Sequence, residues 1–165
     1  MDCLINELIS VLEQEIGLYE EILKVSKDKT SIIVEGKVNE LEEIVKAEHA
    51  LILRVSKVEN QREILINKIS KVINRNPDEI NLTILIENTN EIHGAKLKEQ
   101  QQMLGSYMKE LGSVNELNSQ LIKSSLEYIN FSLNLFANAG SQDNNYGIEG
   151  EKSDVKARSM LDIKI

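Results

Sequence analysis

The sequence predicts an all-α protein: a long antiparallel helical hairpin plus a third long helix, packed as a three-helix coiled-coil bundle. Apolar residues recur three and four positions apart over long stretches, which is the pattern of coiled-coil helices. The 165 residues include one proline, no tryptophan and 4% aromatics, a composition that disfavours β-sandwiches and barrels. A hydrophobic content of 41% fits a single core. We expect a helical bundle domain over residues 1–138 and a flexible C-terminal tail over residues 139–165.

The first helix is expected over residues 2–34. Gly36 follows it, and this residue takes positive φ readily, so it closes the helix and turns the chain back antiparallel. The helix carries two adjacent apolar stripes that make one broad surface. One contains Leu4, Leu8, Val11, Leu18, Ile22, Val25 and Ile32, and the other contains Ile5, Ile9, Leu12, Ile16, Tyr19, Leu23 and Ile33.

The second helix is expected from Val38 to about Asn74. Its apolar stripe is interrupted by Glu48, Glu59 and Arg62, and an offset stripe beside it indicates contact with more than one partner helix. The main stripe contains Val38, Leu41, Val45, Ile52, Val55, Ile66, Ile69 and Ile73, and the offset stripe contains Ile44, Leu51, Val58, Leu65 and Val72.

A short helix is predicted from Pro77 to about Glu87, because proline favours the first turn of a helix. Its inward residues are expected to be Ile80, Ile84 and Leu85.

The third long helix is predicted over residues 91–138, capped by Thr89 or Asn90. Its early seam contains Leu97, Leu104, Met108 and Leu111, separated by glutamines. Near the end of the helix the apolar pattern strengthens into an unbroken series, which we call the C-terminal stripe. It consists of Ile122, Leu126, Ile129, Leu133 and Phe136, with Leu121, Tyr128 and Leu135 beside it.

The lengths of the helices bear on function. At about 1.5 Å per residue, the three long helices would span roughly 50, 54 and 72 Å. A continuous third helix would therefore pass the Gly36 turn and leave the C-terminal stripe unpaired, as expected of a binding site. Alternatively, the helix breaks near Gly105 or Gly112 and folds back as a fourth bundle member, which would hide the stripe.

Four charged residues occupy seam positions of the hairpin. Glu48 and Arg62 lie two heptads apart on the second helix, and Glu15 and Lys29 lie two heptads apart on the first. In a hairpin closed at Gly36, long side chains would allow pairing of Lys29 with Glu48 and of Glu15 with Arg62. We interpret Lys29, Glu48 and Arg62 as register-setting polar positions rather than as contacts to a binding partner.

The sequence gives no sign of catalysis or of a cofactor. His49 and His93 belong to no metal-binding pattern, and phosphate-binding glycine motifs are absent. The net charge of −8 disfavours nucleic-acid binding. Cys3 is the only cysteine, and neither a signal peptide nor an apolar run of membrane-spanning length is present. We expect a cytoplasmic protein that is not an enzyme, has no stable membrane insertion and acts on other proteins.

Several segments together resemble the FlgN family of flagellar export chaperones. They are residues 20–29, 33–41, 44–48 and 59–62, in matching order and spacing around the Gly36 turn. In the tail, residues 145–150 resemble the family's tyrosine-containing turn, and residues 158–162 resemble its terminal element.

The resemblance implies a type III secretion chaperone without a cofactor. Such a protein would bind the C-terminal helical segments of the hook-filament junction proteins FlgK and FlgL, prevent their premature assembly, and deliver them to the export gate protein FlhA. Client binding is expected at the C-terminal stripe, by helix-in-groove recognition. Tyr146, a solitary aromatic in the tail, is expected to dock to the export gate. The main alternative is a self-associating structural coiled-coil scaffold, and a weaker one is a membrane-surface helix that places the C-terminal stripe on lipid. A homodimer is a further candidate assembly.

Overall fold

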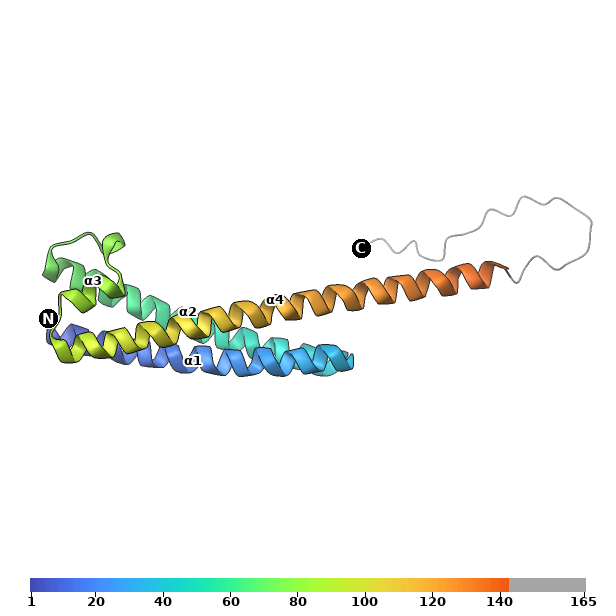
Figure 1. Cartoon of the computed structure of the whole chain (residues 1–165), viewed down its shortest axis with the longest axis horizontal. Coiled ribbons are helices and arrows are strands. Elements are labelled where there is room, and N and C mark those ends of the chain that lie inside the picture. Colours follow the sequence, from blue (N-terminus) through green and yellow to red (C-terminus); the bar gives the residue numbers. More distant parts are fainter. Residues whose placement is uncertain (143–165) are drawn as a thin grey trace, which may run out of the picture. The chain divides into compact units, whose positions relative to one another are not determined.

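The computed structural model describes the backbone of residues 1–142 and the side chains of residues 1–138 (Figure 1). The described part contains helices and connecting turns, with no strand, so the predicted all-α class is confirmed. The elements are α1 (Asp2–Glu35), α2 (Val38–Ile73), the 3-10 helix η1 (Pro77–Glu79), α3 (Leu82–Glu87) and α4 (Glu91–Gln142). The described residues fall into two units, one of Met1–Ser125 and one that begins at Leu126 within α4.

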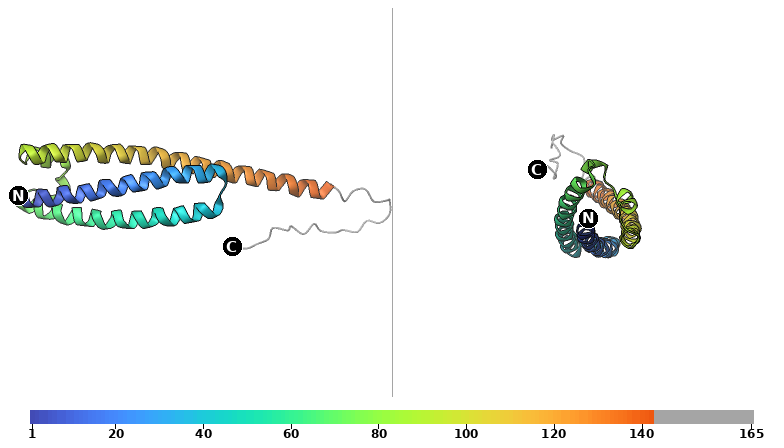
Figure 2. Two further views of the ribbon diagram at one scale, coloured as in Figure 1. Left: turned by 90° about the horizontal axis from the view of Figure 1, so that it is seen from below. Right: turned by 90° about the vertical axis from the view of Figure 1, so that its left-hand side faces the viewer.

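Helices α1 and α2 form the predicted antiparallel hairpin, with Gly36 at the turn (Figure 2). Gly36 has a φ of 67°, a left-handed conformation that costs glycine little. The Gly36 N–H donates to the carbonyl oxygen of Ile33 (3.1 Å), and the Lys37 N–H donates to that of Ile32 (3.2 Å). These bonds satisfy carbonyl groups at the end of α1 and reverse the chain within two residues.

One hydrophobic core runs through the first unit. The residues from α1 are Ile5, Leu8, Ile9, Val11, Leu12, Ile16, Leu18, Ile22 and Leu23; those from α2 are Leu51, Val55, Val58, Leu65 and Ile69; Leu85, Leu97, Leu104 and Leu111 complete it. Because α1, α2 and α4 all contribute, the predicted three-helix bundle is confirmed.

The buried seam of α2 differs from the main stripe predicted for it. Val38, Val45 and Ile52 are exposed, whereas Leu51 and Val58, from the offset stripe, are buried. The seam therefore takes members from both stripes. On α4, Met108 is exposed instead of buried, and its neighbour Tyr107 packs against the core.

The connection between the hairpin and α4 contains two short elements where the sequence predicted one helix over residues 77–87. The backbone is extended at Ile80 (φ −83°, ψ 116°) and at Asn81 (φ −123°, ψ 170°), so η1 ends before α3 begins. Asn81 separates them because its side-chain oxygen accepts a hydrogen bond from the Ile84 N–H (2.9 Å) and caps α3. The predicted inward position of Leu85 is confirmed, since this residue is fully buried.

Helix α4 is continuous, so the alternative with a break near Gly105 or Gly112 is wrong. Its first turn is capped by Asn90, whose side-chain oxygen accepts from the His93 N–H (2.9 Å). The helix extends to Gln142, four residues beyond the predicted end. The rest of the predicted tail, including Tyr146, lies outside the described residues.

Candidate functional site

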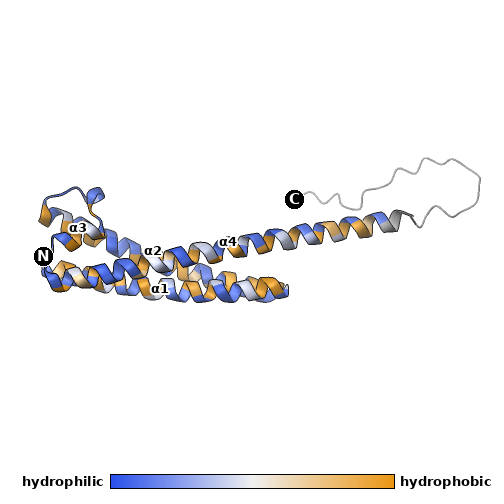
Figure 3. Cartoon of the chain, in the orientation of Figure 1, coloured by the Kyte–Doolittle hydropathy of each residue, from blue (hydrophilic) through white to orange (hydrophobic). Residues whose placement is uncertain are grey.

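The C-terminal stripe of α4 is exposed along its length. Leu126 is 56% exposed, Leu133 58% and Phe136 75%. Ile122 and Ile129 are exposed as well. Apolar residues recur along this part of the helix in Figure 3. An apolar stripe of this size on an exposed helix is typical of a surface that a partner covers.

A second group of large apolar residues lies on another side of the same helical segment. We call it the opposite stripe: Tyr128, Phe131 and Leu135, all exposed. Sequence reasoning placed Tyr128 and Leu135 beside the C-terminal stripe and missed Phe131. The three-and-four spacing of these residues would have identified them as a stripe of their own.

Two serines occupy the arc between these stripes, and their hydroxyl groups are already hydrogen-bonded. The Ser125 hydroxyl donates to the Leu121 carbonyl oxygen, and the Ser132 hydroxyl donates to the Tyr128 carbonyl oxygen, each at 2.9 Å. A buried hydroxyl is costly when it lacks a partner. A protein helix could therefore cover this arc without leaving an unsatisfied serine.

The first polar layer of the bundle is centred on the ion pair between Lys29 and Glu48. The Lys29 Nζ lies 2.6 Å from Glu48 Oε2 and 2.7 Å from Oε1, and the Ser26 hydroxyl donates to Oε1 at 2.8 Å. Asn118 of α4 joins this layer: its Nδ2 donates to the Ser26 carbonyl oxygen (2.9 Å), and its Oδ1 accepts from the Thr30 hydroxyl (2.7 Å). The layer links all three long helices through polar contacts that hold one register.

A second polar layer pairs Glu15 with Arg62. Arg62 Nη1 lies 3.6 Å from Glu15 Oε1, and Glu15 is buried while Arg62 is partly exposed. Burial raises the pKa of the Glu15 carboxyl. The positive charge of Arg62 lowers this pKa, and the negative charge of Glu59 raises it, but burial is the largest of the three effects. Glu15 Oε2 has no hydrogen-bond partner among the described residues. This layer is less well satisfied than the first.

Both cross-hairpin pairs expected from the sequence are therefore present in the structure. The side chains of Lys29, Glu48 and Glu15 are largely buried in the bundle, Arg62 is partly exposed, and all four contact other parts of this chain. Gln100 of α4 makes a similar internal contact, since its Nε2 donates to the Ile9 carbonyl oxygen at 3.0 Å. These contacts favour a structural role for Lys29, Glu48 and Arg62, which stays a prediction.

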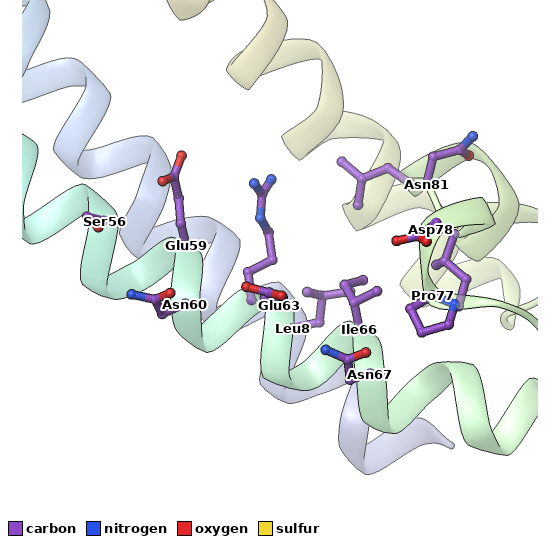
Figure 4. Close-up of a pocket in the computed structure, with 13 residues that line it drawn as sticks. Leu8, Ser56, Glu59, Asn60, Glu63, Ile66, Asn67, Pro77, Asp78 and Asn81 are labelled. Atoms are coloured by element: carbon purple, nitrogen blue, oxygen red, sulfur yellow. The ribbon is translucent and has the colours of Figure 1, made fainter.

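A cavity of about 690 Å³ lies between α2 and the segment around η1 (Figure 4). Its lining includes charged side chains of both signs and several amides: Glu59, Arg62, Glu63, Asp78, Asn60 and Asn67. A lining of this kind is typical of a solvated cleft. Within the described residues, no cluster of histidine, cysteine, aspartate and glutamate is arranged to hold a metal ion. Nor does any described helix meet the length and hydropathy needed to cross a membrane.

A helical bundle with an exposed apolar helical segment defines a class of protein that works by binding other proteins. Comparison with known families narrows this class. The model of the FlgN protein family matches residues 1–154, and the chain belongs to this family. Membership supports a role as a flagellar export chaperone that binds flagellar export substrates.

Among individual proteins, the chain is similar to the uncharacterized protein YvyG of Bacillus subtilis (strain 168). The two are 25% identical over 139 residues, which cover 84% of this chain and 82% of YvyG. No solved structure matches the chain significantly.

Proposed function

We propose that this protein is a cytoplasmic export chaperone for hook-filament junction proteins of the FlgK and FlgL type. It binds their C-terminal helical segments, keeps them from assembling prematurely, and delivers them to the export gate protein FlhA. The observation that carries the proposal is the exposure of the C-terminal stripe on α4. Binding alone would mask the client, so no nucleotide or catalytic group is needed.

The energetics of the C-terminal stripe set a limit on affinity. Full burial of a large apolar side chain contributes about 1.5–3 kcal/mol. The four aliphatic residues of the stripe are already about half covered and Phe136 about a quarter, so each residue would add roughly 1 kcal/mol. The stripe as a whole would then supply about 5 kcal/mol, while association costs at least about 4 kcal/mol. Contacts to the C-terminal stripe alone therefore predict weak binding, and tight capture of a client needs further surface.

The experiment that tests the proposal is a calorimetric titration of the full chain with the C-terminal segment of a FlgK-type junction protein. Leu126→Asp and Leu133→Asp should abolish binding, because a carboxylate in an apolar contact costs several kcal/mol. Asn130→Asp is the matched control, since it adds the same charge at an exposed polar position. Circular dichroism should show all three variants folded. Unchanged affinity would place client binding elsewhere, and global unfolding would mean that the stripe belongs to the core.

Docking to the export gate is assigned in this proposal to Tyr146, outside the described residues. Tyrosine offers a large contact area with few rotatable bonds to restrict. Tyr146→Ala should leave client affinity unchanged and weaken capture of the chaperone-client complex by the cytoplasmic domain of FlhA. Equal recovery of the two complexes in a pull-down would remove Tyr146 from this role.

The exposed stripe also fits a second candidate function, a structural coiled-coil scaffold that associates with copies of itself. Light scattering over a concentration series separates the two functions. A chaperone is expected to stay a monomer or a small dimer and to bind client, whereas stable higher oligomers without client binding would favour the scaffold.

A further inference from the structure

The two apolar stripes near the end of α4 are too far apart around the helix for one partner helix to cover both. Successive residues rotate by about 100°, so the centres of the C-terminal stripe and the opposite stripe lie roughly 140° apart. The face that one helix buries against a neighbour is about 100° wide. Ile129 and Phe131, which are exposed members of the two stripes, illustrate the separation because they lie about 160° apart.

The earlier part of α4 shows what this helix needs in order to pack against two helices. There the buried seam residues Leu97, Leu104 and Leu111 repeat every seven positions and join the core formed with α1 and α2. The same seven-residue register continues through Asn118 to Ser125 and Ser132. The helix positions that join the core in the first unit therefore continue, in the same seven-residue register, into the C-terminal part of α4.

The residue types at the positions beside this seam change along α4. One seven-residue series begins with Gly105 and Gly112 and continues through Ser119 to Leu126 and Leu133. Glycine and serine occupy this series where α4 joins the core of the first unit, whereas leucines stand at the equivalent positions later. A second series also ends in large apolar residues.

That second series passes from Gln101 through Met108 and Asn115 to Ile122, Ile129 and Phe136. Lys123 and Glu127 are the only charged residues between Ile122 and Asn138. A partner for this segment therefore needs apolar contact faces and little complementary charge.

We propose that the C-terminal part of α4 binds two amphipathic helices of its client at once, one on each stripe, in a mixed three-helix bundle. The inference rests on the proposed client-binding function. The client helices would meet over Ser125 and Ser132, whose hydroxyl groups are satisfied by their own helix. This arrangement repeats, between two proteins, the packing that α1 and α2 provide within one chain.

The first test compares one charge substitution on each stripe. Calorimetry uses the full chain and the C-terminal segment of a FlgK-type junction protein, long enough to contain two predicted helices. Ile129→Asp on the C-terminal stripe and Leu135→Asp on the opposite stripe should each weaken binding about tenfold or more. Asn130→Asp, between them on the polar side, should change affinity less than about threefold.

The outcomes separate this inference from the function on which it rests. If only Ile129→Asp weakens binding, the client uses one helix, and the two-helix inference fails while the proposed function stands. If neither substitution weakens binding, both fail. If both substitutions instead abolish self-association of the free chain, measured by sedimentation, the occupant is a second copy and the inference is overturned.

A second measurement does not depend on loss of affinity. In a Cys3→Ser background, which removes the exposed thiol, Ile129→Cys and Leu135→Cys each carry a photoreactive benzophenone. Mass spectrometry should find the two positions cross-linked to two client segments separated in the client sequence by a turn. Cross-links from both positions to the same client helix would overturn the proposal.

Discussion

Removing the Glu48 carboxylate tests whether the first polar layer holds the bundle together. In Glu48→Ala, the Lys29 ammonium loses both carboxylate contacts, at 2.6 and 2.7 Å, and the Ser26 hydroxyl loses its acceptor. The Lys29 side chain is 12% exposed, and no other described carboxylate pairs with it. Breaking a buried ion pair on one side costs about 3–5 kcal/mol. The flexible lysine stem lets the ammonium move toward water, so we expect a loss of about 2–4 kcal/mol.

The assay is urea unfolding of the full chain followed by circular dichroism at 222 nm. A loss of this size should also lower the Tm by about 10 °C. Glu42→Ala is the matched control: it removes a carboxylate from an exposed i,i+4 pair with Lys46, and should cost less than about 0.5 kcal/mol.

The double variant Lys29→Met with Glu48→Leu shows whether the loss comes from an unpaired charge. Apolar replacement of both partners in a buried pair is often neutral or stabilising, so this variant should unfold near the wild-type urea concentration. A stabilising role for this ion pair is refuted if Glu48→Ala is as stable as wild type, and the unpaired charge is not the cause if the double variant is as unstable as Glu48→Ala.

Two further predictions concern the bundle. Arg62→Ala should lower stability by about 2–3 kcal/mol at pH 7, because it leaves the buried Glu15 carboxylate without its counter-charge. Burial raises the Glu15 pKa above its ordinary value near 4.5, so the folded state binds the proton more readily and this group's contribution to stability falls as pH rises through that window. The cost of Arg62→Ala should therefore shrink in urea titrations as pH is lowered toward 4.5, and a cost independent of pH would contradict the assignment. Gly105→Ala and Gly112→Ala should each stabilise the chain by about 0.5–1 kcal/mol in thermal melts, because both glycines lie inside α4 with open space where a Cβ would be; a lower Tm would show that α4 bends at these positions.

Local features that depend on residues close in sequence were predictable. The Gly36 turn follows from the left-handed conformation that glycine adopts at a helix end. The turn set an approximate register, and matching two-heptad spacings brought Lys29 within side-chain reach of Glu48 and Glu15 within reach of Arg62, as the structure shows. The position of the C-terminal stripe also followed from spacing alone, since i, i+3 and i+4 residues share one helix face.

Other features depended on how neighbouring helices are rotated and spaced. The sequence offered two adjacent stripes on α2, and only packing against α1 and α4 decided that Leu51 is buried while Ile52 is exposed. On α4, helix packing likewise buries Leu104 and Leu111 and leaves Met108 exposed. The hydrogen bonds of Asn118 to Ser26 and Thr30 join residues about 90 positions apart, beyond the reach of any periodic pattern.

By itself, the sequence determined the helical class, the hairpin turn and the apolar stripe on which the proposed function depends, because these follow from local conformation and period. Tertiary structure decided the continuity of α4 and the exposure of that stripe. Glycine inside a helix costs only about 1 kcal/mol, a penalty too small to settle from sequence whether the chain bends. Burial of Leu97, Leu104 and Leu111 on both sides of Gly105 outweighs that cost, so the helix continues through this glycine. Leu126 and Leu133, later in the same helix, are exposed.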